Sequence, residues 1–107
     1  MTVDHIIQAT EDCQAGLVHF NNGNTHSFLF RNTWYPIRAI INYASNLARE
    51  NEEYRTNGAL TKLVEILPYV KIEVIPVINN ELVSLTNVEK MEEIQILSEM
   101  IFGLSSI

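Results

Sequence analysis

The segment 28–41 restricts the fold of this chain more than any other part of the sequence. It holds four aromatic residues, a proline and then apolar residues at helical spacing. Alternating apolar residues predict a short strand at 27–31, and residues 32–33 are expected to turn it into a second strand at 34–35. Pro36 suits the first position of a helix, where a missing N–H costs nothing. The sequence therefore predicts a β-hairpin that leads directly into a helix.

Apolar periodicity also predicts the remaining elements. A strand is expected at 70–78, where Pro76 marks an edge or a bend, and residues 79–80 should turn the chain back into a strand at 82–85. Apolar residues that recur every three or four positions predict helices at about 2–16, 36–48, 59–67 and 88–104. The sequence thus predicts an α+β fold in which a small antiparallel sheet of two short hairpins packs against three or four helices.

Composition limits the class of protein. The chain has 107 residues, of which 47% are apolar, and this suits one domain with a modest core over residues 1–107. Cys13 is the only cysteine, so an internal disulfide and a cysteine-based zinc site are excluded and a reducing compartment is expected. The N-terminus lacks the features of a signal peptide, and no apolar run reaches the roughly 20 residues of a membrane span. We expect a cytoplasmic protein with no membrane partner.

The sequence gives no positive argument for an enzyme. The histidines at 5, 19 and 26 have no metal-ligand spacing, and Cys13 has no basic neighbour that would activate it. The acidic runs at 50–53 and 92–93 are expected to be solvated, and no glycine-rich phosphate loop is present. We therefore predict no catalytic residue, no metal and no cofactor.

Charge is distributed unevenly along the chain. The net charge is −6, yet residues 14–49 contain three arginines and no acidic residue. Basic residues that alternate with aromatic ones are typical of a nucleic-acid contact, in which arginine meets phosphate and a ring stacks on a base. The other interpretation is that the aromatic residues form core and the arginines only solubilise the surface. The predicted contact residues are Arg31, Trp34, Tyr35, Arg38 and Arg55.

The C-terminal part carries the opposite charge. Residues 72–107 contain six glutamates and one lysine, and the apolar surface of the predicted helix at 88–104 is wider than one stripe. That width indicates either burial on two sides within the domain or a homodimer contact through this helix. Acidic side chains here could imitate DNA phosphates and dock on a basic groove of another protein. The residues of this alternative interface are Glu89, Glu92, Glu93 and Glu99.

Four short segments follow one another in a recognisable order. They are Val3-Asp4-His5-Ile6-Ile7, Tyr35-Pro36-Ile37-Arg38-Ala39-Ile40-Ile41, Tyr54-Arg55-Thr56-Asn57-Gly58 and Leu67-Pro68-Tyr69-Val70. Together they resemble the N-terminal head domain of modification-dependent HNH restriction endonucleases, over about residues 3–75. Arg38 stands where that family usually has lysine. The nuclease residues of the family belong to a separate HNH domain, so the resemblance implies no catalytic role for these residues.

Two functional hypotheses follow. The resemblance and the basic, aromatic segment favour a non-catalytic recognition module that is associated with nucleic acid or with DNA-targeting defence. The acidic ends favour the alternative, an interaction module such as a phage- or plasmid-encoded inhibitor of a bacterial defence nuclease. DNA is the expected partner under the first hypothesis, and a defence nuclease or another protein under the second.

Overall fold

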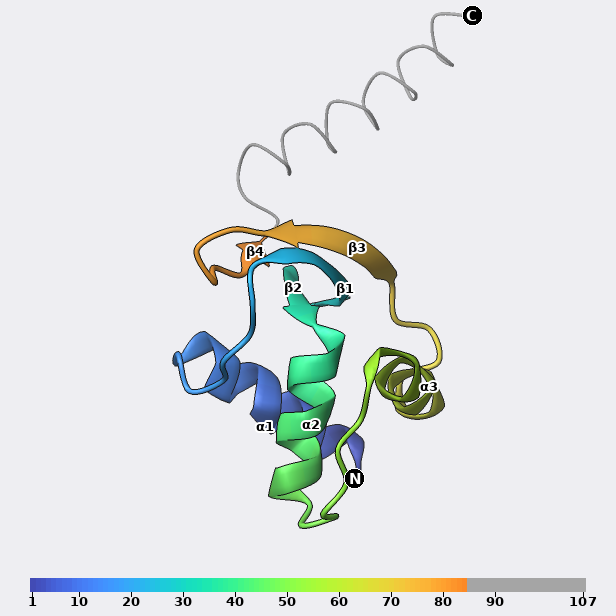
Figure 1. The fold of residues 1–107 in the computed structure, drawn as a ribbon. Helices are drawn as coiled ribbons and strands as arrows, with labels where there is room; N and C mark the ends of the chain where they lie inside the picture. Colours follow the sequence, from blue (N-terminus) through green and yellow to red (C-terminus); the bar gives the residue numbers. More distant parts are fainter. Residues whose placement is uncertain (85–107) are drawn as a thin grey trace, which may run out of the picture.

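The computed structural model describes residues 1–84, and Figure 1 shows their arrangement. Three helices lie on one side of a four-stranded antiparallel sheet in this part of the chain, which confirms the predicted α+β class. The predicted helix at 88–104 lies outside the described residues. The described elements are α1 (Val3–Gln14), β1 (Gly23–Phe30), β2 (Thr33–Pro36), α2 (Ile37–Leu47), α3 (Thr56–Ile66), β3 (Ile72–Val77) and β4 (Val83–Ser84).

The sheet has the order β3-β1-β2-β4, and the predicted hairpin of β1 and β2 is present. Its turn is Arg31-Asn32, one residue earlier than predicted, and both residues have positive φ angles of 49° and 66°. Two such residues form the tight turn whose twist matches that of the flanking strands. β1 is also longer than predicted, because it begins at Gly23, inside a segment whose composition predicts a turn.

The second predicted hairpin is wrong. The chain does turn at residues 79–80, but β4 does not pair with β3. It pairs with β2, at the opposite edge of the sheet. Leu29 N–H donates to the Lys71 carbonyl at 2.9 Å, and in this register alternate residues of β3, among them Pro76, direct their nitrogens away from β1. Proline has no N–H to offer a further strand at that edge, so the free edge of β2 is the better partner.

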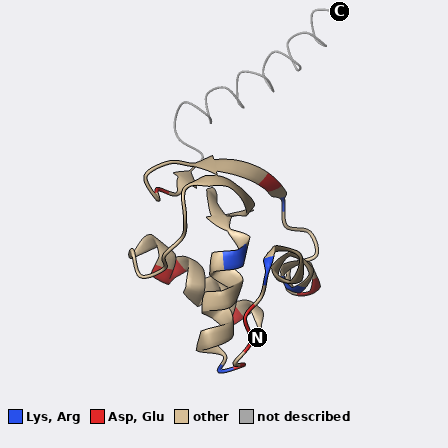
Figure 2. Ribbon diagram, in the orientation of Figure 1, with Lys and Arg blue, Asp and Glu red and all other residues tan. Residues whose placement is uncertain are grey.

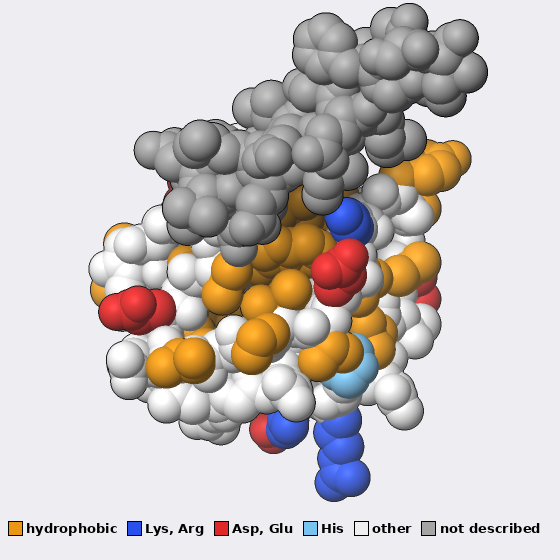
Figure 3. All heavy atoms as spheres, turned by 90° about the horizontal axis from the view of Figure 1, so that it is seen from above, with side chains coloured by type: hydrophobic (Ala, Val, Ile, Leu, Met, Phe, Trp, Pro, Cys, Tyr) orange, Lys and Arg blue, Asp and Glu red, His pale blue; other side chains and the backbone are white. Residues whose placement is uncertain are grey.

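Adjacent residues of β2 face opposite sides of the sheet. Tyr35 pairs with Phe28 on the helix side, where their ring centroids are 5.8 Å apart within the core formed by α1, α2 and α3. Trp34 faces the other side. The register places four further apolar side chains on that outer face, and Figure 3 shows hydrophobic side chains gathered there beside a basic and an acidic one. The apolar residues of the outer face are Leu29, Trp34, Ile75, Val77 and Val83.

The ends of α1 are defined by specific contacts. Thr2 is the N-cap residue, and its backbone N–H donates to Nδ1 of His5 at 3.0 Å, which is the contact that glutamate usually makes in a capping box. At the other end, Gly16 has a φ of 81°, and its N–H donates to the Cys13 carbonyl while Leu17 N–H donates to the Asp12 carbonyl. This is a Schellman motif, so Gly16 ends the helix as expected.

The starts of α2 and α3 differ slightly from the prediction. Pro36 is the N-cap residue of α2 and the last residue of β2, not the first residue of the helix. α3 begins at Thr56, so Gly58 lies within the helix and not before it. Val64, which helical apolar spacing would place inward, is 44% exposed, whereas Ala59 and Leu63 are fully buried. No helix among the described residues is long and apolar enough to cross a membrane.

Candidate functional site

The predicted contact residues do not form one surface. Tyr35 is 4% exposed, and its hydroxyl accepts a hydrogen bond of 3.0 Å from the Gln14 amide. Trp34 is 7% exposed and has the Lys71 ammonium 5.9 Å from its ring centroid. Because the two rings are buried on opposite faces of the sheet, neither is available to stack on a base together with the other. The interpretation that these aromatic residues are core fits the structure better.

Arg31 is separated from the other predicted arginines. It lies in the β1–β2 turn, at the opposite end of β2 from Arg38. Its guanidinium is 3.7 Å from the Glu11 carboxylate and 5.0 Å from the Phe30 ring centroid. An exposed ion pair of this kind contributes little energy, but it gives Arg31 an acidic neighbour within the same chain.

Arg38 and Arg55 lie together. Arg38 is in the first turn of α2, Arg55 is the N-cap residue of α3, and both are exposed. They line one open hollow with Thr56 and Asn57, which begin α3. Figure 2 shows basic positions near the starts of these two helices. The first turn of α3 contains no acidic residue, so the N–H groups of the helix start and the two guanidinium groups add their positive potential.

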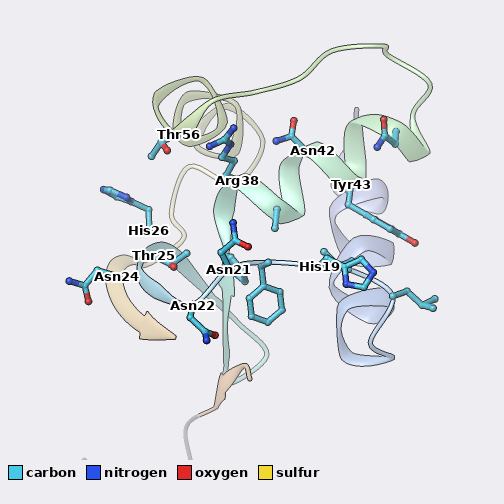
Figure 4. Close-up of a pocket in the computed structure, with 16 residues that line it drawn as sticks. His19, Asn21, Asn22, Asn24, Thr25, His26, Arg38, Asn42, Tyr43 and Thr56 are labelled. Carbon is cyan, nitrogen blue, oxygen red and sulfur yellow. The ribbon is translucent and has the colours of Figure 1, made fainter. Parts of the chain in front are cut away.

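A second pocket of about 620 Å³, lined by more residues, adjoins this hollow and shares Arg38 and Thr56 with it. It lies between the segment 17–26 and the flank of α2 (Figure 4). His26 stands at one end, and His19 and Tyr43 stand at the other, while the Asn21 amide points across toward Arg38. None of the lining residues is acidic. They are Leu17, Val18, His19, Phe20, Asn21, Asn22, Asn24, Thr25, His26, Pro36, Arg38, Ala39, Asn42, Tyr43, Asn46 and Thr56.

Hydrogen bonds between distant segments hold the walls of the pocket. The Asn42 amide donates to the Tyr54 carbonyl at 2.9 Å and accepts from the Tyr54 N–H at 2.6 Å, which fixes the loop before α3 to α2. Asn22 accepts from the Asn80 N–H at 2.6 Å. The two bonds between Asn42 and Tyr54 place Arg55 beside Arg38, although the two arginines are far apart in the sequence.

Tyr43 is tied to α1 by its hydroxyl, which donates to Asp12 at 2.6 Å. This hydrogen bond to a carboxylate, with burial and the negative charge of Asp12, raises the pKa of Tyr43. The pKa of Tyr54 is raised to about 12 by its interaction with Glu52, by burial and by the charge of Glu50. Both phenols therefore stay protonated at neutral pH and act as structural donors.

The described residues offer little to covalent or metal chemistry. Burial raises the pKa of the Cys13 thiol to about 11, which keeps it protonated and unreactive at neutral pH. Within residues 1–84, no group of three or more His, Cys, Asp and Glu side chains comes together as a metal site. His5 caps α1, whereas His19 and His26 are exposed at the pocket.

Sequence reasoning missed most of the pocket. The sequence pattern predicts ordinary surface positions for His19 and His26, and it predicts a turn at the asparagines 21, 22 and 24. The one available signal was the density of asparagine and histidine within 19–26 together with the absence of acid. The alternative interface of Glu89, Glu92, Glu93 and Glu99, like the proposed helix contact between two copies, lies outside the described residues.

Comparison with known proteins adds no assignment. No family model matches the chain, and no curated protein or solved structure is significantly similar to it.

Proposed function

We propose that this protein is a non-catalytic recognition module that binds nucleic acid through the Arg38–Arg55 surface, which comprises Arg38, Arg55, Thr56 and Asn57. One observation carries the proposal: in a chain of net charge −6, the part described by the structure lines this hollow and the adjoining pocket without a single carboxylate. Acidic side chains would repel a polyanion, so their exclusion from these two concave parts of the surface favours an anionic ligand.

The chemistry of the surface suits phosphate. Guanidinium groups bind phosphate oxygens with two parallel hydrogen bonds, and the exposed Arg38 and Arg55 are close enough to line the same hollow. The helix start at Thr56 adds backbone N–H groups that have no partner within the helix. A surface with two arginines and a helix start is suited to one or two adjacent phosphates of a strand.

Charge reversal tests this proposal. In a fluorescence-anisotropy titration against single-stranded and duplex DNA at about 50 mM salt, where phosphate contacts are strong, Arg38→Glu/Arg55→Glu should lose most of its affinity. The matched control is Arg31→Glu/Arg49→Glu, which changes the net charge equally at two exposed arginines outside both hollows. The control should retain binding apart from a small uniform loss.

Either of two results would refute the proposal. The parent protein could bind no DNA at low salt, or the two double variants could lose affinity equally. Salt dependence provides a second readout, because replacing one phosphate-contacting arginine should reduce the slope of log affinity against log salt by about one. The resemblance to restriction endonuclease head domains supports placing this binding in DNA-targeting defence, with modified DNA as the first substrate to compare.

The net charge of −6 favours one second candidate, an acidic interaction module that inhibits a bacterial defence nuclease. In that case Arg38→Glu/Arg55→Glu would keep its function. Replacing Glu89, Glu92, Glu93 and Glu99 by glutamine would instead abolish inhibition of the nuclease. The two sets of variants therefore separate the candidates.

A further inference from the structure

The pocket beside the Arg38–Arg55 surface has the composition of a ligand site. Its volume of about 620 Å³ lies within the range of small-molecule pockets, roughly 300–1,000 Å³. Val18 and Pro36 are buried and Ala39 is half-buried, so the pocket has an apolar floor, whereas the surrounding amides other than Asn42 are exposed. An apolar floor with a few polar groups above it is suited to a flat, weakly polar ligand.

The asparagines of the pocket fall into two groups. Asn42 and Asn22 are engaged by backbone partners and hold the walls together. The side chains of Asn21, Asn24 and Asn46 make no hydrogen bond to the rest of the described chain, although they line the same space. A carboxamide offers a donor and an acceptor side by side, and this pair matches the edge of a nucleobase.

Rings are also available in the pocket. Phe20 is half-buried against the core, His19 is exposed, and Tyr43 stands beside His19 at one end (Figure 4). Unpaired bases are bound in proteins by stacking on such rings and by hydrogen bonds to their edges. No lining residue is acidic, and Arg38 belongs both to this pocket and to the arginine hollow, so a base here could remain attached to a phosphate there.

We infer that the pocket takes one unstacked base of the bound strand, held by the free amides of Asn21 and Asn46, while the phosphate of that nucleotide lies at Arg38 and Arg55. This inference rests on the proposed function. The expected ligand is therefore a single-stranded segment or an unpaired nucleotide, and not a regular duplex whose bases are stacked.

The test compares strands that differ only in their bases. The full chain is titrated by fluorescence anisotropy with a thymidylate strand of about ten nucleotides and with an abasic strand of equal length and charge. The thymidylate strand should bind at least about fivefold more tightly, since stacking of one base on an aromatic residue has an effect of that order. Asn21→Ala/Asn46→Ala should lower the affinity for the thymidylate strand and leave that for the abasic strand unchanged.

Controls separate this inference from the proposed function. Gln8→Ala, which removes an exposed amide on α1 outside the pocket, should keep the preference for thymidylate. Equal binding of the two strands by the parent protein would refute the pocket inference and leave the arginine surface intact. An undiminished preference in Asn21→Ala/Asn46→Ala would also refute it, provided that Trp34 fluorescence shows the variant to be folded. If neither strand binds, the proposed function itself fails.

Discussion

The hydrogen bonds between Asn42 and Tyr54 allow the most exact prediction. They are the only side-chain hydrogen bonds from α2 to Tyr54 within residues 1–84, and they set the path of the loop that ends at Arg55. Asn42→Ala removes both bonds, at 2.9 Å and 2.6 Å. A typical intramolecular hydrogen bond contributes about 1 kcal/mol, so the clamp should contribute about 2 kcal/mol to the free energy of unfolding.

Helix propensity must be separated from this value. Replacing asparagine by alanine within a helix is itself favourable by about 0.5 kcal/mol, which would hide part of the loss. Asn46→Ala is the matched control, because Asn46 lies one turn later in α2, is exposed and makes no side-chain hydrogen bond within the described residues. The difference between the two variants therefore reports the clamp alone, and we expect it to be about 2 kcal/mol.

Trp34 provides the assay. It is the only tryptophan of the chain and is 7% exposed, so urea unfolding should change its emission clearly. A difference of about 2 kcal/mol corresponds to about 8–16 °C in the melting temperature of a domain of this size. If Asn42→Ala and Asn46→Ala unfold within about 0.5 kcal/mol of each other, the clamp does not hold the loop. In that case the reason given for the proximity of Arg38 and Arg55 is wrong.

Three further predictions concern the backbone and the thiol. Gly16→Ala should lower the free energy of unfolding by about 1 kcal/mol, because Gly16 has a positive φ that alanine adopts only with strain, even though the space around it is open. Gly58→Ala should raise the free energy of unfolding by a similar amount, because Gly58 lies within a helix and a Cβ there would only touch Tyr54. Thermal melts that move both variants in the same direction would contradict this. Arg31→Asn should stabilise the chain by about 0.5–1 kcal/mol in urea titrations, since asparagine tolerates the positive φ of this turn better than arginine. The raised pKa of Cys13, about 11 against 9.0, implies about 100-fold less thiolate at pH 8, so a thiol reagent should react slowly until urea is added. The same shift means that the unfolded chain releases this proton first, so stability should fall as pH rises from about 9 to about 11. This fall should be smaller in Cys13→Ala, where only the raised pKa values of Tyr43 and Tyr54 contribute to it.

Local patterns were sufficient to predict most elements. The alternation before Pro36 and the three-to-four spacing after it are short-range signals, and the hairpin and α2 follow from them directly. The pairing of β4 could not be predicted in this way. It depends on which sheet edge can still accept a strand, and this is known only once β3 has been placed against β1.

In the candidate site, too, some features could be predicted from local sequence patterns and others could not. Trp34 and Tyr35 are adjacent in a strand, and adjacent side chains of a strand face opposite sides of the sheet. The sequence alone therefore already argues against a single contact face that contains both rings. The proximity of Arg55 to Arg38, by contrast, could not be predicted from a local pattern. It depends on the Asn42–Tyr54 clamp, which joins residues 12 positions apart through a side chain. No local pattern indicates that contact.

The distinctive Tyr35-Pro36-Ile37-Arg38 segment can now be divided by what each residue does. Tyr35 and Ile37 are buried in the core, and Pro36 ends β2 and caps α2. These three residues turn a strand into a helix, and any chain that makes this junction benefits from them. Arg38 alone is exposed, at the point where the arginine hollow and the adjoining pocket meet. The motif therefore argues mainly for a fold, and its contribution to ligand recognition is the single basic side chain that the junction directs outward.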